Sequence, residues 1–132
     1  MFISLDIKTN RRNEFINITN RIYEKIKNSG IINGLCILHV PHTTAGLTIN
    51  ENADADVVLD ILSKMVKLIP QNDNFLHIEG NSDAHIKSSL FGPTLSLIIE
   101  NGDIVLGTWQ AVYFCEFDGP RNRRVFLKII KT

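Results

Sequence analysis

The sequence has few cysteines, no net charge and no long run of apolar residues. Its two cysteines, Cys36 and Cys115, lie in apolar segments, so we expect buried free thiols rather than a disulfide. The formal net charge at pH 7 is +0, which argues against nucleic-acid and anionic-membrane partners, since both usually require a basic protein. No apolar run reaches the length of a membrane span, and no signal peptide precedes the first strand pattern. These absences predict a cytoplasmic protein.

The composition is otherwise that of an ordinary globular chain. Hydrophobic residues make up 44% and charged residues 21% of the 132 residues. A chain of this length can build a hydrophobic core without disulfides or metal ions. We find no internal repeat, linker or low-complexity stretch, and we therefore predict one domain over residues 1–132.

Hydrophobic periodicity predicts strands and helices in the first two thirds of the chain. Apolar residues alternate in the predicted strands, and they recur at helical spacing in the predicted helices, which have turn residues at their ends. The predicted strands are 2–9, with 14–18 as its partner, 35–40 and 47–50. The predicted helices run from Thr19 to Ser29, from Asn52 or Asp54 to Pro70, and from 82 to 91.

The last third is predicted to be β-structure. Residues 94–100 and 103–107 flank Asn101-Gly102, a pair that favours the type I′ turn of a tight hairpin. Residues 111–117 and 124–130 predict a second pair of strands. The fold class is therefore predicted as α+β, a mainly antiparallel β-sheet with helices packed on one face.

The most informative segment is 42–51, HTTAGLTINE, which lies between a predicted strand and a predicted helix. Binding and catalytic groups are often found on such connecting segments. His42 opens the segment and is a candidate functional group. Thr43, Thr44 and Gly46 offer hydroxyl groups and accessible backbone N–H groups that could hold a phosphate, although the same residues are also common in turns.

Asn50 and Glu51 come directly before the second predicted helix. Glu51 could simply interact with the helix dipole, which favours a negative charge at this end. However, Asn50, Glu51 and Asn52 form a polar triplet where one capping residue would suffice. We therefore treat Glu51 as a candidate site carboxylate.

A second polar cluster lies between residues 77 and 87 and contains two histidines. His77, His85 and His42 come from separate segments and could together bind a metal ion such as zinc with one open position. Their spacing is not a metal signature, so hydrogen-bond donors or proton carriers are an equal alternative.

A third cluster follows a strongly apolar strand. Trp109 could belong to the core, or its ring could stack on a heterocycle while the Gln110 amide reads the ring edge. Arg121, Arg123 and Arg124 could lie at a solvated hairpin end, or they could bind a phosphate group with paired hydrogen bonds.

Several unusual strings of this sequence resemble one family, the YjbQ-like proteins, described as secondary thiamine-phosphate synthases. The strings are ITNRI (18–22), HTTAGLTINENADADV (42–57), DAHIKSSLFG (83–92) and LGTWQAVYFCEFDGPRNRR (106–124). The resemblance covers residues 2 to 130. Ala55 stands where the family pattern has proline, which should affect only the start of the helix.

The resemblance implies a homotrimer with pockets near subunit boundaries. It also implies a transferase that joins an aminopyrimidine methyl diphosphate to a thiazole phosphate, as a main or secondary activity. We expect a phosphorylated small-molecule substrate and a divalent metal ion, magnesium or zinc, as cofactor. The expected catalytic residues are His42, Glu51, His85 and Gln110. The expected metal ligands are His42, His77 and His85. The expected substrate-binding residues are Thr43, Thr44, Gly46, Asn50, Lys87, Thr108, Trp109, Glu116, Arg121 and Arg124.

Two other functions fit the same residue types. One is a metal-dependent hydrolase of a phosphorylated small molecule, and the other is a non-catalytic trimeric metabolite-binding protein. Residue types alone do not distinguish them, because binding pockets and active sites use the same side chains.

Overall fold

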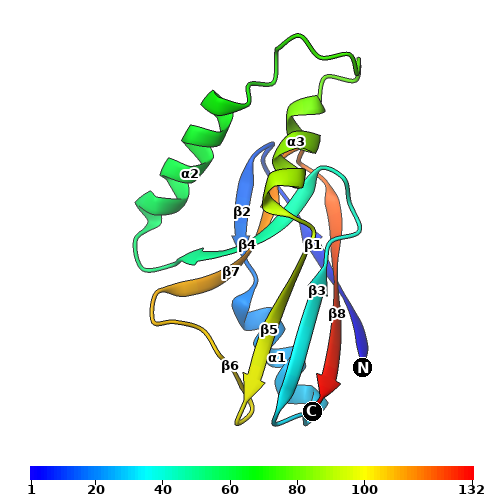
Figure 1. Cartoon of the computed structure of the whole chain (residues 1–132), viewed down its shortest axis with the longest axis vertical. Coiled ribbons are helices and arrows are strands. Elements are labelled where there is room, and N and C mark those ends of the chain that lie inside the picture. Colours follow the sequence, from blue (N-terminus) through cyan, green and yellow to red (C-terminus); the bar gives the residue numbers. More distant parts are fainter.

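A computed structural model describes residues 1–132 as eight strands and three helices (Figure 1). The strands are β1 (Phe2–Lys8), β2 (Glu14–Asn17), β3 (Gly34–His39), β4 (Ala45–Glu51), β5 (Thr94–Glu100), β6 (Asp103–Ile104), β7 (Gln110–Glu116) and β8 (Asn122–Lys131). The helices are α1 (Thr19–Ser29), α2 (Ala55–Leu68) and α3 (Ser82–Phe91).

The strands form two sheets in which every pairing is antiparallel. The larger sheet has the order β1-β8-β3-β5-β6, and the smaller sheet has the order β2-β7-β4. Successive side chains of a strand point to opposite faces. In β1, Leu5 and Ile7 are therefore buried, whereas Ser4 and Asp6 on the other face are exposed. The larger sheet thus has one buried face and one outer face.

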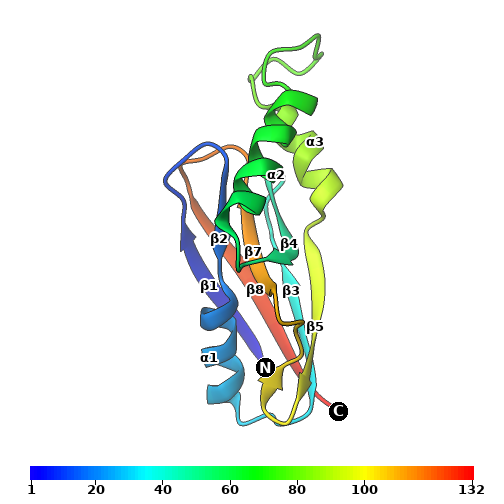
Figure 2. The ribbon, with the colours of Figure 1, turned by 90° about the vertical axis from the view of Figure 1, so that its left-hand side faces the viewer.

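The main core lies between the larger sheet and the elements that cover its inner face. α1 contributes Ile22 and Ile26, while the smaller sheet contributes Leu47 and Phe114, to one cluster of 17 buried residues. Figures 1 and 2 show α1 and the smaller sheet along the same side of the larger sheet. Gly30 ends α1 in the left-handed conformation, with a φ of 74°.

α2 stands apart from this core and buries none of its residues completely. The Asp54 side chain accepts a hydrogen bond from the Asp56 N–H at the start of the helix, as expected for an N-cap. Val58 packs against a smaller aromatic cluster that contains Tyr113. Figure 1 shows α2 leaning away from the sheets, joined to α3 by a long loop.

The predicted fold class is confirmed: the chain is an α+β domain with antiparallel sheets and three helices. The predicted hairpin is also confirmed, with φ angles of 53° at Asn101 and 78° at Gly102. The predicted pairings of 2–9 with 14–18 and of 111–117 with 124–130 are wrong. In both cases the intervening turn carries the chain from one sheet to the other, so strands that are adjacent in sequence do not pair.

Both cysteines are buried and free, as predicted. No helix of the structure combines the length and apolar character needed to span a membrane. A cytoplasmic location stays a prediction.

Candidate functional site

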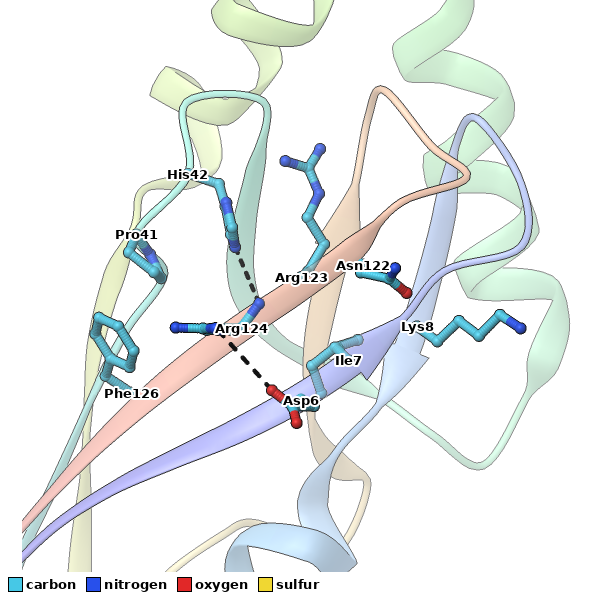
Figure 3. A pocket seen from close by; sticks show the side chains of 9 residues that line it. All are labelled: Asp6, Ile7, Lys8, Pro41, His42, Asn122, Arg123, Arg124 and Phe126. Carbon is cyan, nitrogen blue, oxygen red and sulfur yellow. Dashed lines mark hydrogen bonds and ion pairs between the residues drawn. The ribbon is translucent and has the colours of Figure 1, made fainter.

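The site begins where β3 ends beside β8. The β3–β8 ladder stops at the pair His39–Phe126, and Pro41 then turns the chain away. The backbone N–H of Arg124 lies beyond this last pair and has no strand partner on that side. The ring of His42 takes the place of a strand carbonyl: its Nε2 accepts a hydrogen bond from the Arg124 N–H at 2.9 Å (Figure 3).

This hydrogen bond determines the protonation of His42. Nε2 can accept the Arg124 N–H only when it carries no proton, so a neutral ring has its proton on Nδ1. Burial lowers the pKa of His42 below its ordinary value, and the positive charges of Arg123 and Arg124 lower it further, against an opposing effect of Glu116. His42 is therefore a neutral hydrogen-bond donor, and its Nε2 is not free to act as a base.

A buried ion pair supports the segment that follows His42. The carboxylate of Glu116, which is fully buried, accepts hydrogen bonds from the Arg123 guanidinium, from the Thr9 hydroxyl and from the N–H groups of residues 117 and 118. Arg123 also donates to the Thr44 hydroxyl at 2.8 Å. Glu116, predicted to bind substrate, is thus engaged within the protein and fixes the position of Thr44.

A second buried network anchors the start of α3. Asp83 accepts two hydrogen bonds from Arg12, at 3.0 and 3.1 Å, and one from Lys87 at 2.9 Å. Burial alone would raise the pKa of Asp83, but the hydrogen bonds from the two cations outweigh it and lower that pKa. The Lys87 side chain is only 1% exposed. Lys87, predicted to bind phosphate, is therefore committed to Asp83.

Asp118 lies beside α3 and is the centre of a third hydrogen-bond network. Its carboxylate accepts hydrogen bonds from the Asn81 amide and from Arg121, both at 2.9 Å. Burial acts to raise the pKa of Asp118, but these hydrogen bonds and the charges of Arg121 and Arg12 lower it. Asp118 stays ionised at neutral pH and holds the Arg121 side chain at the mouth of the site.

These networks surround a hollow of about 370 Å³ without hydrophobic lining residues, which we call the polar hollow. Its lining residues are Pro41, His42, Thr43, Thr44, Glu79, Asn81, His85, Asp118, Arg121 and Arg123. Segments that are far apart in the sequence thus meet here, including the predicted first and second polar clusters.

A second and larger hollow of about 670 Å³, which we call the outer groove, lies on the outer face of the larger sheet (Figure 3). It is lined by Asp6, Ile7, Lys8, Pro41, His42, Asn122, Arg123, Arg124 and Phe126. His42 and Arg123 line both hollows, so the two are neighbours.

The three histidines do not form a metal site in one chain. The rings of His77 and His85 are perpendicular, with centroids 5.5 Å apart, and His77 Nδ1 lies 3.1 Å from the Ser82 hydroxyl. His42 would have to give up its bond to the Arg124 N–H to ligate a metal through Nε2. No group of three or more histidine, cysteine, aspartate or glutamate side chains has an arrangement that could hold a metal ion. The residues present therefore do not fit the predicted metal centre within a single chain.

The third predicted cluster, GTWQ at residues 107–110, lies far from the polar hollow. Ala45 pairs with Glu116 at one end of the β4–β7 ladder, and Glu51 pairs with Gln110 at the other end. Ala45 and Glu51 are six positions apart on β4, which corresponds to about 20 Å. Trp109 is 62% exposed next to Gln110. Asn50 and Thr108 are also exposed at this distal end, so one chain does not combine all the predicted site residues.

Sequence reasoning missed several residues that build the site. Thr9, Arg12 and Asp118 hold the buried carboxylates and the arginines in place. Thr9 and Arg12 belong to no motif, and Asp118 lies in the string 106–124 without having been predicted as a site residue. Thr9 lies more than 100 residues from its partner Glu116. Only Thr9 could have been noticed in the sequence. It follows Leu5 and Ile7 at the same two-residue spacing, so the strand pattern places a polar side chain on the buried face.

Comparisons with known proteins place the chain in a family. The family model described as UPF0047 protein YjbQ-like matches residues 3–132. A UPF0047 protein of Methanocaldococcus jannaschii is 53% identical over 98% of this chain and 94% of its own length, and YugU of Bacillus subtilis is 47% identical over 98% and 99%. A crystal structure from Clostridium acetobutylicum has a TM-score of 0.95 at 52% identity and covers 97% of this chain and 99% of its own.

These names overturn one expectation. The relatives are named only as UPF0047 proteins, and a neighbour from Sulfolobus solfataricus, with a TM-score of 0.95 at 30% identity over 100% of this chain and 97% of its own, is described as a YbjQ-like protein of unknown function. The comparisons give no support for thiamine-phosphate synthesis, and that prediction is wrong. The predicted family is confirmed: this chain belongs to the UPF0047 family of YjbQ-like proteins.

Proposed function

We propose that the polar hollow binds the phosphate group of a small phosphorylated molecule. The proposal rests on which side chains of the polar hollow already make hydrogen bonds within the protein and which do not. The carboxylates of Glu116 and Asp118 are occupied by internal hydrogen bonds, so they do not offer free negative charge to a ligand. Glu79 is the remaining carboxylate, and its side chain is 72% exposed at the rim.

The groups left free are mostly donors. His42 offers the N–H of Nδ1, and Thr43 is exposed with a hydroxyl that makes no internal hydrogen bond. Arg121 is half-exposed and has N–H groups beyond those that bond Asp118. Several N–H and O–H donors around one small volume are the usual way in which proteins hold a phosphate.

His85 supplies the group that can move a proton beside that phosphate. Its half-buried ring lines the polar hollow and makes no internal hydrogen bond. A neutral histidine ring has one nitrogen that can donate a proton and one that can accept a proton, which general acid–base chemistry requires. Because Nε2 of His42 is occupied, we assign the proton-transfer role to His85 and the donor role to His42.

Calorimetric titration with inorganic phosphate tests the proposal. We expect saturable binding that Arg121→Gln weakens by about tenfold or more, since a hydrogen bond to a charged group contributes about 1.5–3 kcal/mol. Arg21→Gln removes the same charge from the exposed side of α1 and should bind like the wild type. If phosphate does not bind, or if both variants weaken binding equally, the polar hollow is not the phosphate site.

We also propose that three copies of the chain assemble, as the family resemblance implies. Two apolar surfaces support this. α2 leaves Leu59 and Leu68 exposed by 58% and 63%, and the outer face of the larger sheet leaves Ile98 and Ile130 exposed by 54% and 39%. Exposed apolar surfaces on separate parts of a chain favour contacts between unlike faces, which can close into a ring. In such a ring, the end of the β4–β7 ladder that carries Glu51 and Gln110 can lie against the polar hollow of the neighbouring subunit.

A further inference from the structure

We propose that the polar hollow and the outer groove form one two-part site for a phosphorylated compound with a planar ring, the class of a nucleoside monophosphate. This inference rests on the proposed phosphate site and adds the ring subsite. The two hollows share the lining residues Pro41, His42 and Arg123, so they adjoin at this end of β8, and a ligand that occupies both would contact His42 and Arg123.

The ring subsite lies between two side chains of β8. Arg124 and Phe126 alternate with buried residues and project from the same outer face of the strand (Figure 3). Residues two apart on a strand are separated by about 7 Å, which leaves room for one flat ring between their planes. A guanidinium and a phenyl ring both stack on the faces of aromatic heterocycles.

The remaining walls of the outer groove suit the edge of such a ring. Asp6 and Asn122 line it with an acceptor carboxylate and an amide, and Lys8 adds a positive charge. Asp6 is held only loosely, since its nearest distance to Arg124 is 4.0 Å and its side chain is 93% exposed. These groups are therefore free to bond to ring substituents.

The spacing of the two subsites sets the length of the ligand. The ring subsite between Arg124 and Phe126 is centred two residues along β8 from Arg123, which borders the polar hollow, or about 7 Å away. A phosphate and a base joined through ribose match this spacing, whereas a phosphate joined directly to a ring does not. The geometry therefore favours a sugar-sized spacer.

The test compares three probes on the full-length protein by calorimetric titration: inorganic phosphate, ribose 5-phosphate and adenosine 5′-monophosphate. The expected result is that adenosine 5′-monophosphate binds at least about fivefold tighter than ribose 5-phosphate, the lower end of the effect of one stacked base. Phe126→Leu should remove that difference and leave the affinity for ribose 5-phosphate unchanged. Phe2→Leu is the matched control, because Phe2 contacts Phe126 but does not line the groove.

The outcomes separate this inference from the proposed function. If none of the three probes binds, the phosphate site itself is refuted. If phosphate and ribose 5-phosphate bind but the adenine adds less than about fivefold, the phosphate site stands and the ring subsite is refuted. The wild-type comparison decides this even if Phe126→Leu fails to fold. An adenine preference that survives in a folded Phe126→Leu variant would also refute the assignment.

Discussion

Replacing Glu116 with glutamine should destabilise the protein strongly, although the side chain keeps its size. One carboxylate oxygen accepts hydrogen bonds from Thr9 and Arg123, and the other accepts them from Arg123 and from the N–H groups of residues 117 and 118. A glutamine must place its NH₂ group at one of these positions, where it faces donors in either orientation. The buried Arg123 charge also loses its counterion.

The expected cost follows from that loss. Breaking a buried ion pair by removing one partner costs about 3–5 kcal/mol. Domains of ordinary stability unfold with about 5–15 kcal/mol, so Glu116→Gln should remove a large share of the total. At roughly 4 °C per kcal/mol for a chain of this size, the Tm should fall by about 12–20 °C.

Urea unfolding followed by circular dichroism, at one fixed protein concentration, measures this cost. Glu24→Gln on the exposed side of α1 is the matched control and should change the free energy of unfolding by no more than about 0.5 kcal/mol. Adding Arg123→Met to Glu116→Gln should recover part of the loss, because it removes the unpaired charge. A loss below about 1 kcal/mol for Glu116→Gln would refute the account of this network.

The other predictions concern His42 and assembly. Titration by NMR should give His42 a pKa below its ordinary value of 6.5, because burial and Arg123 disfavour its charged form. The stability gained by keeping His42 neutral should be complete above about pH 6.5 and should fall as pH drops toward its folded-state pKa, since the unfolded chain then binds the proton more readily. His42→Gln should lack this pH dependence; an equal dependence in both proteins would contradict the lowered pKa of His42. Light scattering should give about three times the subunit mass of 14.9 kDa, and Leu59→Glu on α2 should lower it; a monomeric wild type would exclude the trimer.

Local sequence patterns were sufficient to predict most of the elements. The helix from Thr19 to Ser29 and its glycine end, the Asp54 cap and the Asn101-Gly102 turn all depend on residues within a few positions of one another. Strand partners depend on distant residues instead. Nothing near residues 118–120 shows that β7 and β8 belong to different sheets, because the partners of β8 are β1 and β3.

The sequence was sufficient to name many of the residues near the site, but it was not sufficient to say which of them are free to contact a ligand. His42, Thr43 and Thr44 line the polar hollow together with His85 and Arg121. Lys87 and Glu116 carry the charges that phosphate binding and catalysis use, yet both are buried and paired. Sequence shows that a charge is present, whereas its partner, Asp83 or Arg123, decides whether a ligand can reach it.

The role of His42 illustrates why the remaining chemistry needed the structure. A histidine beside two threonines favours a base or a metal ligand when only neighbours in sequence are considered. Its actual partner is a backbone N–H of Arg124, a group that every residue except proline has and that no motif can mark. That N–H is available because β3 stops three residues before His42 while β8 continues. The difference in length between two neighbouring strands therefore occupies Nε2 of His42 and makes the ring a hydrogen-bond donor through Nδ1.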